Sequence, residues 1–229
     1  KIMHFVFFYT YFGLSSSIGL IFLYILSGCS HPIQTKTFTN QGNLADNDTL
    51  EVASASLLRI EEGLEAQDAT RIREGIETLM QNNILIISTE VRPNGQFTYK
   101  NLLNEAKSFR NTPPDELAKI DRLLEVLERP QQPLLMVNVC RAKLTKKNET
   151  SSNCTIKTFR NGDLRVLVRT VPQDIEWRLE GNNLTSCTGC WQIWKGSGRI
   201  QWITQKNQTH LVLIRNLSSV SGTFLLTWN

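Results

Sequence analysis

The spacing of apolar residues changes near residue 134, and this change constrains the fold more than any other feature of the sequence. Between Leu50 and Leu127 apolar side chains recur every three or four positions, which is the spacing of helices with one buried face. From Leu134 onward the period is two, and turn-forming residues recur about every eight to twelve positions. The sequence therefore predicts an α+β fold, in which helices and a small β hairpin precede an antiparallel, sandwich-like β domain.

The first helical stretch contains a repeat. Asp48 with Glu51 forms a candidate capping box for a helix over 49–66, and Asp68 is the expected cap of a second helix that stops at Asn82. A seven-residue motif occurs in both, as Arg59-Ile-Glu-Glu-Gly-Leu-Glu65 and Arg71-Ile-Arg-Glu-Gly-Ile-Glu77. Two copies are too few for a solenoid. A helical hairpin is favoured over one long helix, in which each glycine would cost up to ~1 kcal/mol.

Three shorter patterns follow. The β-branched run after Ile84 meets the turn signal Arg92-Pro-Asn-Gly95, which predicts a small hairpin or a strand with an irregular return. A short helix is expected over 101–110. Thr112-Pro-Pro-Asp-Glu116 predicts the start of another helix, with the Thr112 hydroxyl as its cap. Prolines then mark the predicted boundary between an α-rich segment, 49–130, and a β domain, 133–229.

The β domain is expected to contain eight strands, at 134–144, 154–159, 163–170, 174–180, 190–195, 199–205, 209–216 and 221–228. The stretch from His210 to Phe224 resembles the E-to-F corner of immunoglobulin-type domains, with Phe224 in the place of the corner tyrosine. No Cys…Trp…Cys frame surrounds this corner. The resemblance therefore implies a sandwich without identifying its family.

Charge divides the chain in the same way. Residues 29–132 hold 11 Lys and Arg against 16 Asp and Glu, a net charge of −5, whereas 133–229 hold 13 against 5, a net charge of +8. All five tryptophans and four of the five cysteines lie in the basic part. The contrast predicts an acidic helical segment and a basic β domain.

The N-terminal sequence predicts where the protein is located. Ile2 to Gly28 contains no Asp, Glu, Lys or Arg and ends in Leu26-Ser-Gly-Cys29, which resembles the lipobox of bacterial lipoproteins. In that family the cysteine is lipidated and becomes the first mature residue. The resemblance implies a signal peptide over 1–28, a lipidated Cys29 and a flexible tether over 29–48. It also implies an anchor in the outer membrane, since Ser30 rather than Asp follows the cysteine. An uncleaved signal anchor is the alternative.

The remaining four cysteines predict disulfides, because an exported chain more often pairs its thiols than leaves them free. Cys140 with Cys154 and Cys187 with Cys190 are the favoured pairs, and the other two connectivities stay open. The Cys187-Thr-Gly-Cys190 spacing also occurs in redox sites and zinc sites. However, strand-like sequence flanks it on both sides and no second close pair exists, so neither a redox nor a metal site is expected.

The sequence indicates binding rather than catalysis. His31 and His210 are the only histidines after the predicted signal peptide, which disfavours a histidine-dependent catalytic site or a cofactor metal. Ligand contact is expected from a basic, tryptophan-rich hairpin that contains Trp191, Trp194, Lys195, Arg199 and Trp202. Packing in the core is the alternative for its indole rings. An envelope protein or an anionic glycan is the expected partner. Nucleic acid is not expected, because an exported protein rarely meets it.

These observations predict a membrane-anchored envelope lipoprotein with a non-catalytic binding or assembly role. An enzyme acting on envelope glycans or thiols is one alternative. The other is a eukaryotic or viral surface glycoprotein, since the chain contains six glycosylation patterns, at Asn47, Asn148, Asn153, Asn183, Asn207 and Asn216.

The lipid anchor gives a direct prediction. Replacing Cys29→Ser should abolish acylation and leave the protein unanchored or held as a precursor, because the hydroxyl cannot take the place of the modified thiol. Metabolic labelling with a fatty acid measures this. A serine variant that is still labelled would show that Cys29 is not the acceptor.

Overall fold

The computed structural model describes residues 47–88, 91–92, 95–129, 135–158, 161–181 and 187–229, and Gly42–Asn229 forms one compact unit. The predicted signal peptide, Cys29 and most of the predicted tether lie outside the described residues. No helix within the described ranges is both long and apolar enough to cross a membrane.

Four helices precede the main sheets: α2 (Asn47–Ala66), α3 (Ala69–Gln81), α4 (Tyr99–Lys107) and α5 (Pro114–Leu127). The helical hairpin is confirmed, and Asp68 caps α3 by accepting hydrogen bonds from the backbone N–H groups of Thr70 and Arg71. Two predicted caps are wrong. Asp48 lies inside the first turn of α2, and Pro113 precedes α5 while the Thr112 hydroxyl donates to the carbonyl of Ala106.

The repeated motif forms the contact between α2 and α3. A Cβ on Gly63 would lie 2.8 Å from Ile72, and a Cβ on Gly75 would lie 2.6 Å from Ile60, so each glycine admits the isoleucine of the other copy. The arginines and glutamates are reciprocal too: Arg59 pairs with Glu74, and Arg71 pairs with Glu62 at 3.5 Å. The two copies are thus complementary to each other, which accounts for the repeat.

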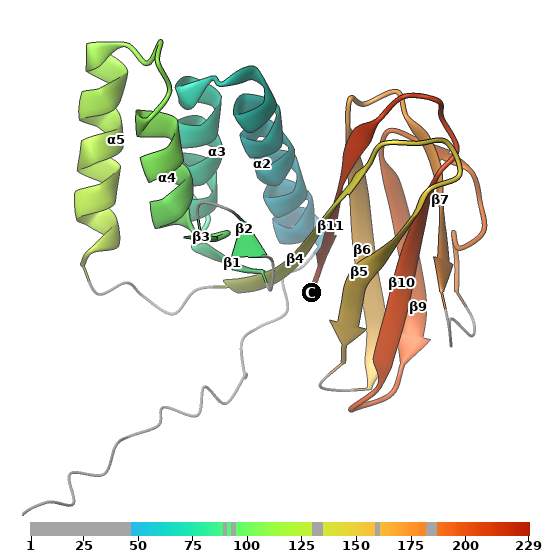
Figure 1. Cartoon of the computed structure of the whole chain (residues 1–229). Helices are drawn as coiled ribbons and strands as arrows, with labels where there is room; N and C mark the ends of the chain where they lie inside the picture. The colour runs from blue at the N-terminus through green and yellow to red at the C-terminus, as the bar shows by residue number, and fades with distance from the viewer. Residues whose placement is uncertain (1–46, 89–90, 93–94, 130–134, 159–160, 182–186) are drawn as a thin grey trace, which may run out of the picture. The chain divides into compact units, whose positions relative to one another are not determined.

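The strands form two large sheets and one two-stranded ribbon (Figure 1). The five-stranded sheet has the order β1 (Ile84–Ser88), β4 (Leu135–Leu144), β11 (Gly222–Trp228), β6 (Gly162–Val171) and β9 (Gly198–Thr204). The four-stranded sheet has the order β5 (Thr150–Lys157), β10 (Thr209–Asn216), β7 (Glu176–Gly181) and β8 (Trp194–Lys195). Each of the eight predicted strands has a counterpart, but β5 begins at Thr150 rather than at 154, and only Trp194–Lys195 of the predicted strand 190–195 is a strand. The orders β4-β11-β6-β9 and β5-β10-β7-β8 are those of the two sheets of a jelly roll, which differ from the orders in an immunoglobulin-type sandwich.

The prediction for residues 84–99 was incomplete. β2 (Val91–Arg92) and β3 (Gly95–Gln96) do form a small hairpin. However, β1 pairs in parallel with β4, from Ile84 beside Leu135 to Ser88 beside Val139. A strand of the helical segment therefore extends the sheet of the β domain, a long-range pairing that no local pattern reveals.

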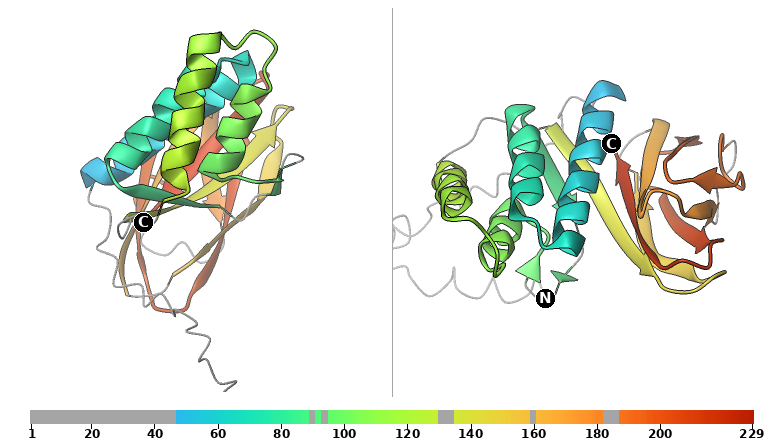
Figure 2. Two further views of the ribbon diagram at one scale, coloured as in Figure 1. Left: turned by 90° about the vertical axis from the view of Figure 1, so that its left-hand side faces the viewer. Right: turned by 90° about the horizontal axis from the view of Figure 1, so that it is seen from above.

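The five-stranded sheet is covered on both faces. Figures 1 and 2 show α2 between the other helices and this sheet. On the helix side, Leu167 and Leu225 join the helical core, whereas Val166, Phe224 and Leu226 point into the core between the two sheets. All seven residues of β11 are buried as a result.

Acidic side chains of α2 meet basic side chains of the sheet. Glu61 is fully buried and accepts hydrogen bonds from the guanidinium of Arg141 on β4, including one of 2.9 Å from Nε. Nearer the start of α2, Glu51 pairs with Arg169 of β6 and Arg199 of β9. The contrast between an acidic helical segment and a basic β domain is therefore partly neutralised inside the fold.

Candidate functional site

The segment from Cys187 to Lys195 is a loop that is fixed at several points. The Cys187–Cys190 disulfide closes it, and the Thr188 backbone exchanges hydrogen bonds of 2.7 and 3.1 Å with Gln201 on the edge of β9. The backbone N–H of Trp191 donates to the Leu179 carbonyl at 3.1 Å, and the Trp194 indole donates to the Gly189 carbonyl at 3.0 Å. We call residues 187–195 the disulfide loop. Its conformation is set by the protein before any partner arrives.

This fixed loop exposes large apolar side chains. Trp191 is 59% exposed and Ile193 is 62% exposed. Trp191 also has a φ of +66°, a left-handed conformation that a bulky residue seldom adopts. Backbone strain of this kind and exposed apolar groups both concentrate at binding sites. The disulfide loop is therefore a candidate contact surface.

A pocket lies where the disulfide loop continues into β8 and β9. It encloses about 220 Å³ and is lined by Glu51, Leu167, Val168, Arg169, Trp194, Ser197, Gly198 and Arg199. Trp194 stacks on the buried Trp177, with ring centroids 6.2 Å apart and 18° between the planes. Gly198 makes this stack fit beside β9, because a Cβ there would lie 2.6 to 2.7 Å from both indoles. We call this the arginine pocket.

The arginine pocket takes its charge from three side chains. Arg169 Nη2 lies 3.0 Å from Oε2 of Glu51, and Arg199 Nη2 contacts Oε1 of the same carboxylate. Arg169 also donates from Nε to the Ser54 hydroxyl at 3.0 Å. Two guanidinium groups thus share one carboxylate, which leaves a local excess of one positive charge.

The structure brings together only part of the predicted ligand set. Trp194 and Arg199 line the arginine pocket, while Trp191 and the exposed Lys195 belong to the disulfide loop. Trp202 was wrongly grouped with them: it is 1% exposed in the core between the sheets, edge-on to His210 at 5.7 Å. A buried indole offers no face to a ligand.

Arg169 and Glu51 were not among the site residues predicted from the sequence. Strand alternation places Arg169 on the same face of β6 as Leu167, but only the helix docking reveals that this face meets Glu51. Arg199, which was predicted to contact a ligand, also carries an internal ion pair with Glu51. No sequence pattern connects residues 51, 169 and 199.

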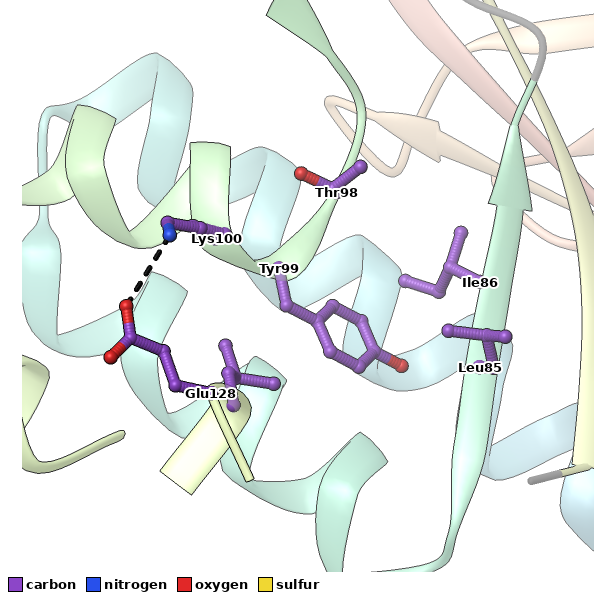
Figure 3. Close-up of a pocket in the computed structure, with 7 residues that line it drawn as sticks. Leu85, Ile86, Thr98, Tyr99, Lys100 and Glu128 are labelled. Carbon is purple, nitrogen blue, oxygen red and sulfur yellow. Dashed lines mark hydrogen bonds and ion pairs between the residues drawn. The ribbon is translucent and has the colours of Figure 1, made fainter. Parts of the chain in front are cut away.

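A second, mostly apolar pocket of about 360 Å³ lies between β1, α4 and the end of α5 (Figure 3). Tyr99 donates from its hydroxyl to the Ile84 carbonyl at 2.6 Å, and burial raises the pKa of this phenol above its ordinary value. Lys100 and Glu128 form an exposed ion pair of 3.5 Å at its rim. The phenol stays protonated at neutral pH and ties α4 to the sheet.

Both favoured disulfides are present. Cys140–Cys154 joins β4 to β5 and therefore links the two sheets, with 5.7 Å between the Cα atoms. The Cys187–Cys190 bridge lies in a loop that leads into a strand. Within the described residues, no group of three or more His, Cys, Asp or Glu side chains is arranged to hold a metal ion.

The side-chain exposure of three of the glycosylation asparagines is described. Asn148 and Asn207 are exposed at turns with φ of +63°, a conformation that asparagine tolerates better than most residues. Asn216 is fully buried, and its amide nitrogen donates to the Val220 carbonyl at 2.8 Å. The positive φ of the two turns is sufficient to explain why asparagine occupies the first two positions. The third asparagine is not accessible to a glycan in the folded chain.

No protein-family model matches the chain, and no curated protein matches it either. A de novo designed double-stranded β-helix aligns with 15% identity and a TM-score of 0.27 over 40% of this chain and 97% of the design. A mitogen from Yersinia pseudotuberculosis aligns with 14% identity and a TM-score of 0.28 over 41% and 84% of the two chains. The pre-peptidase C-terminal domain of a Bacillus anthracis collagenase aligns with 11% identity and a TM-score of 0.27 over 40% and 87%. These likenesses are too distant to indicate a function.

The packing of Gly198 gives a testable prediction. Gly198→Ala should lower the free energy of unfolding by roughly 1–3 kcal/mol, because the added methyl overpacks two stacked indoles, one of which, Trp177, is fully buried. Urea unfolding measures the loss, and near-ultraviolet circular dichroism should report a changed tryptophan signal. The exposed neighbour Ser197→Ala is the control. If both variants match the wild type in stability and spectrum, the stack does not depend on Gly198.

Proposed function

We propose that this chain is a lipid-anchored envelope lipoprotein whose jelly-roll part has a non-catalytic binding or assembly role. The Leu26-Ser-Gly-Cys29 motif supports the anchor, and the outer membrane is the proposed location. The two disulfides are consistent with an exported chain. Acyl chains on Cys29 would hold the protein at the membrane, while the following polar stretch would let the folded part reach a partner.

The disulfide loop is the observation that carries the binding role. Four fixed points hold its backbone, and yet two of its largest apolar side chains face solvent. A surface that is fixed before binding avoids the entropic cost of ordering it in the complex, and tryptophan is enriched among residues that dominate interface energetics. This combination favours a protein contact centred on Trp191 and Ile193.

The charges beside the disulfide loop indicate which charge the partner's surface should carry. Arg199 is engaged with Glu51, so it contributes less to an outer basic surface than its sequence position suggests. Lys195 is exposed at the end of the disulfide loop and has no ion pair within the described residues. An envelope protein with an acidic rim around an apolar centre would complement this surface, and salt would slow its association.

Site-specific photo-crosslinking in the intact envelope tests the proposal. A photoreactive residue at position 193 of the full chain should give one discrete adduct, and adding Trp191→Ala should reduce its yield at least about tenfold, a change typical of losing an interface anchor. The matched control is position 126 on α5, because Val126 is also an exposed apolar residue, at 41%.

Two results would contradict the proposal. The first is the absence of any adduct from position 193. The second is the same set of adducts from positions 193 and 126, which would mean that both report only random encounters at the surface.

A further inference from the structure

The arginine pocket holds a carboxylate in a defined way. The two oxygens of Glu51 are bound by different arginines, Oε2 by Arg169 and Oε1 by Arg199. The arginines come from neighbouring strands, β6 and β9, whose pairing fixes the distance between their backbones. Glu51 comes from a separate layer, the first turns of α2. The sheet thus supplies a carboxylate-binding pair, and the helix supplies the carboxylate.

The pair of arginines has capacity left for a ligand. Each guanidinium carries five N–H donors, and the contacts with Glu51 and Ser54 use only a few of them. The side chains of Arg169, Arg199 and Glu51 are 24%, 52% and 38% exposed, so solvent and small solutes reach the group. One carboxylate does not neutralise two cations. A second anion is therefore attracted to the pocket, and it competes with Glu51 for the same donors.

The walls of the pocket favour a ring over a small inorganic anion. Trp194 provides an indole whose position is fixed by stacking on Trp177 and by its hydrogen bond to Gly189. Ser197 adds a hydroxyl, and Leu167 adds a small apolar area on the same face of β6 as Arg169. An indole packs well against the C–H face of a pyranose ring, and the pocket volume of about 220 Å³ is on the scale of a single ring rather than of a longer chain.

An acidic peptide fits less well. A peptide that binds at a sheet edge adds its backbone to the open strand. Here the edge strand next to the pocket is β9, and its Gln201 backbone already exchanges both hydrogen bonds with Thr188. The disulfide loop thus covers the edge at this position, and a side-chain-sized carboxylated ring is the better match.

We propose that the arginine pocket binds a carboxylated pyranose, of the uronic acid class, with its carboxylate between Arg169 and Arg199 and its ring against Trp194. Glu51 occupies the carboxylate position in the ligand-free protein. Binding therefore exchanges an internal carboxylate for an external one and frees the first turns of α2 from the sheet. The pocket shares Trp194 with the disulfide loop but not the exposed contact residues Trp191 and Ile193, and this proposal does not rest on the function proposed for that loop.

Calorimetric titration of the full chain in detergent tests the proposal, with glucuronate as the probe and glucose and inorganic phosphate for comparison. Glucuronate should bind at least about tenfold more tightly than glucose, because only the former supplies the charge-assisted hydrogen bonds. It should also bind more tightly than phosphate, which leaves Trp194 unused. Arg199→Gln should weaken glucuronate binding at least about tenfold, and this exposed side chain can be changed without emptying the core.

The decisive comparison is between two glutamates of α2. Glu51→Gln should strengthen glucuronate binding several-fold by removing the competing carboxylate. Glu62→Gln removes the same charge from the same helix but lies outside the pocket, where Glu62 pairs with Arg71 and accepts from Gln173. It should leave affinity unchanged. A thermal melt of each variant reports whether it is folded at the titration temperature.

Three results would overturn the proposal. Equal affinity for glucuronate and glucose would remove the role of the arginines. Phosphate binding as tightly as glucuronate would reduce the pocket to a general anion site. Equal effects of Glu51→Gln and Glu62→Gln in folded protein would mean that Glu51 does not occupy the ligand position.

Discussion

The attachment of α2 to the five-stranded sheet is the constraint on which the rest of the structure depends, and the Glu61–Arg141 ion pair lies at its centre. Glu61 is fully buried and the Arg141 side chain is 17% exposed, so both groups have lost most of their hydration. Glu61 Oε2 has no hydrogen-bond partner within the described part of the chain. The guanidinium of Arg141 is therefore the group that offsets the lost hydration of the Glu61 carboxylate. Breaking such a pair from one side typically costs about 3–5 kcal/mol, because an uncompensated charge remains.

This attachment gives the sheet two different faces. Strands β6 and β11 place apolar side chains in the helical core on one face and in the core between the sheets on the other. Arg141 and Arg169 both lie opposite Leu225 in the strand register, so basic and apolar groups form one row under α2. The arginine pocket is the end of this row. There the helix covers the sheet incompletely, and the ion pairs of Glu51 remain accessible to solvent.

The sequence predicted what depends on local spacing. Helix α3 with its Asp68 cap, most of the strands of the sandwich and the two favoured cysteine pairs all follow from patterns within short stretches of the chain. The pairing of β1 with β4, the burial of Trp202 and the meeting of Glu51 with Arg169 depend on contacts between distant segments. The charge contrast was visible in the sequence. Its partial neutralisation between layers was not, because net charge does not say which charges meet.

A double-mutant cycle on Glu61→Leu and Arg141→Leu, followed by urea unfolding, tests most directly whether this ion pair holds the helices to the sheet. Each single variant should lose about 3 kcal/mol, since it removes one member of a buried charge pair while the other stays buried. The double variant should lose about 3–4.5 kcal/mol instead of the additive sum of about 6 kcal/mol, which corresponds to a coupling free energy of roughly 1.5–3 kcal/mol, because two leucines can pack where the charges were. Strictly additive losses would contradict the account, since they would mean that Glu61 and Arg141 stabilise the fold independently of each other.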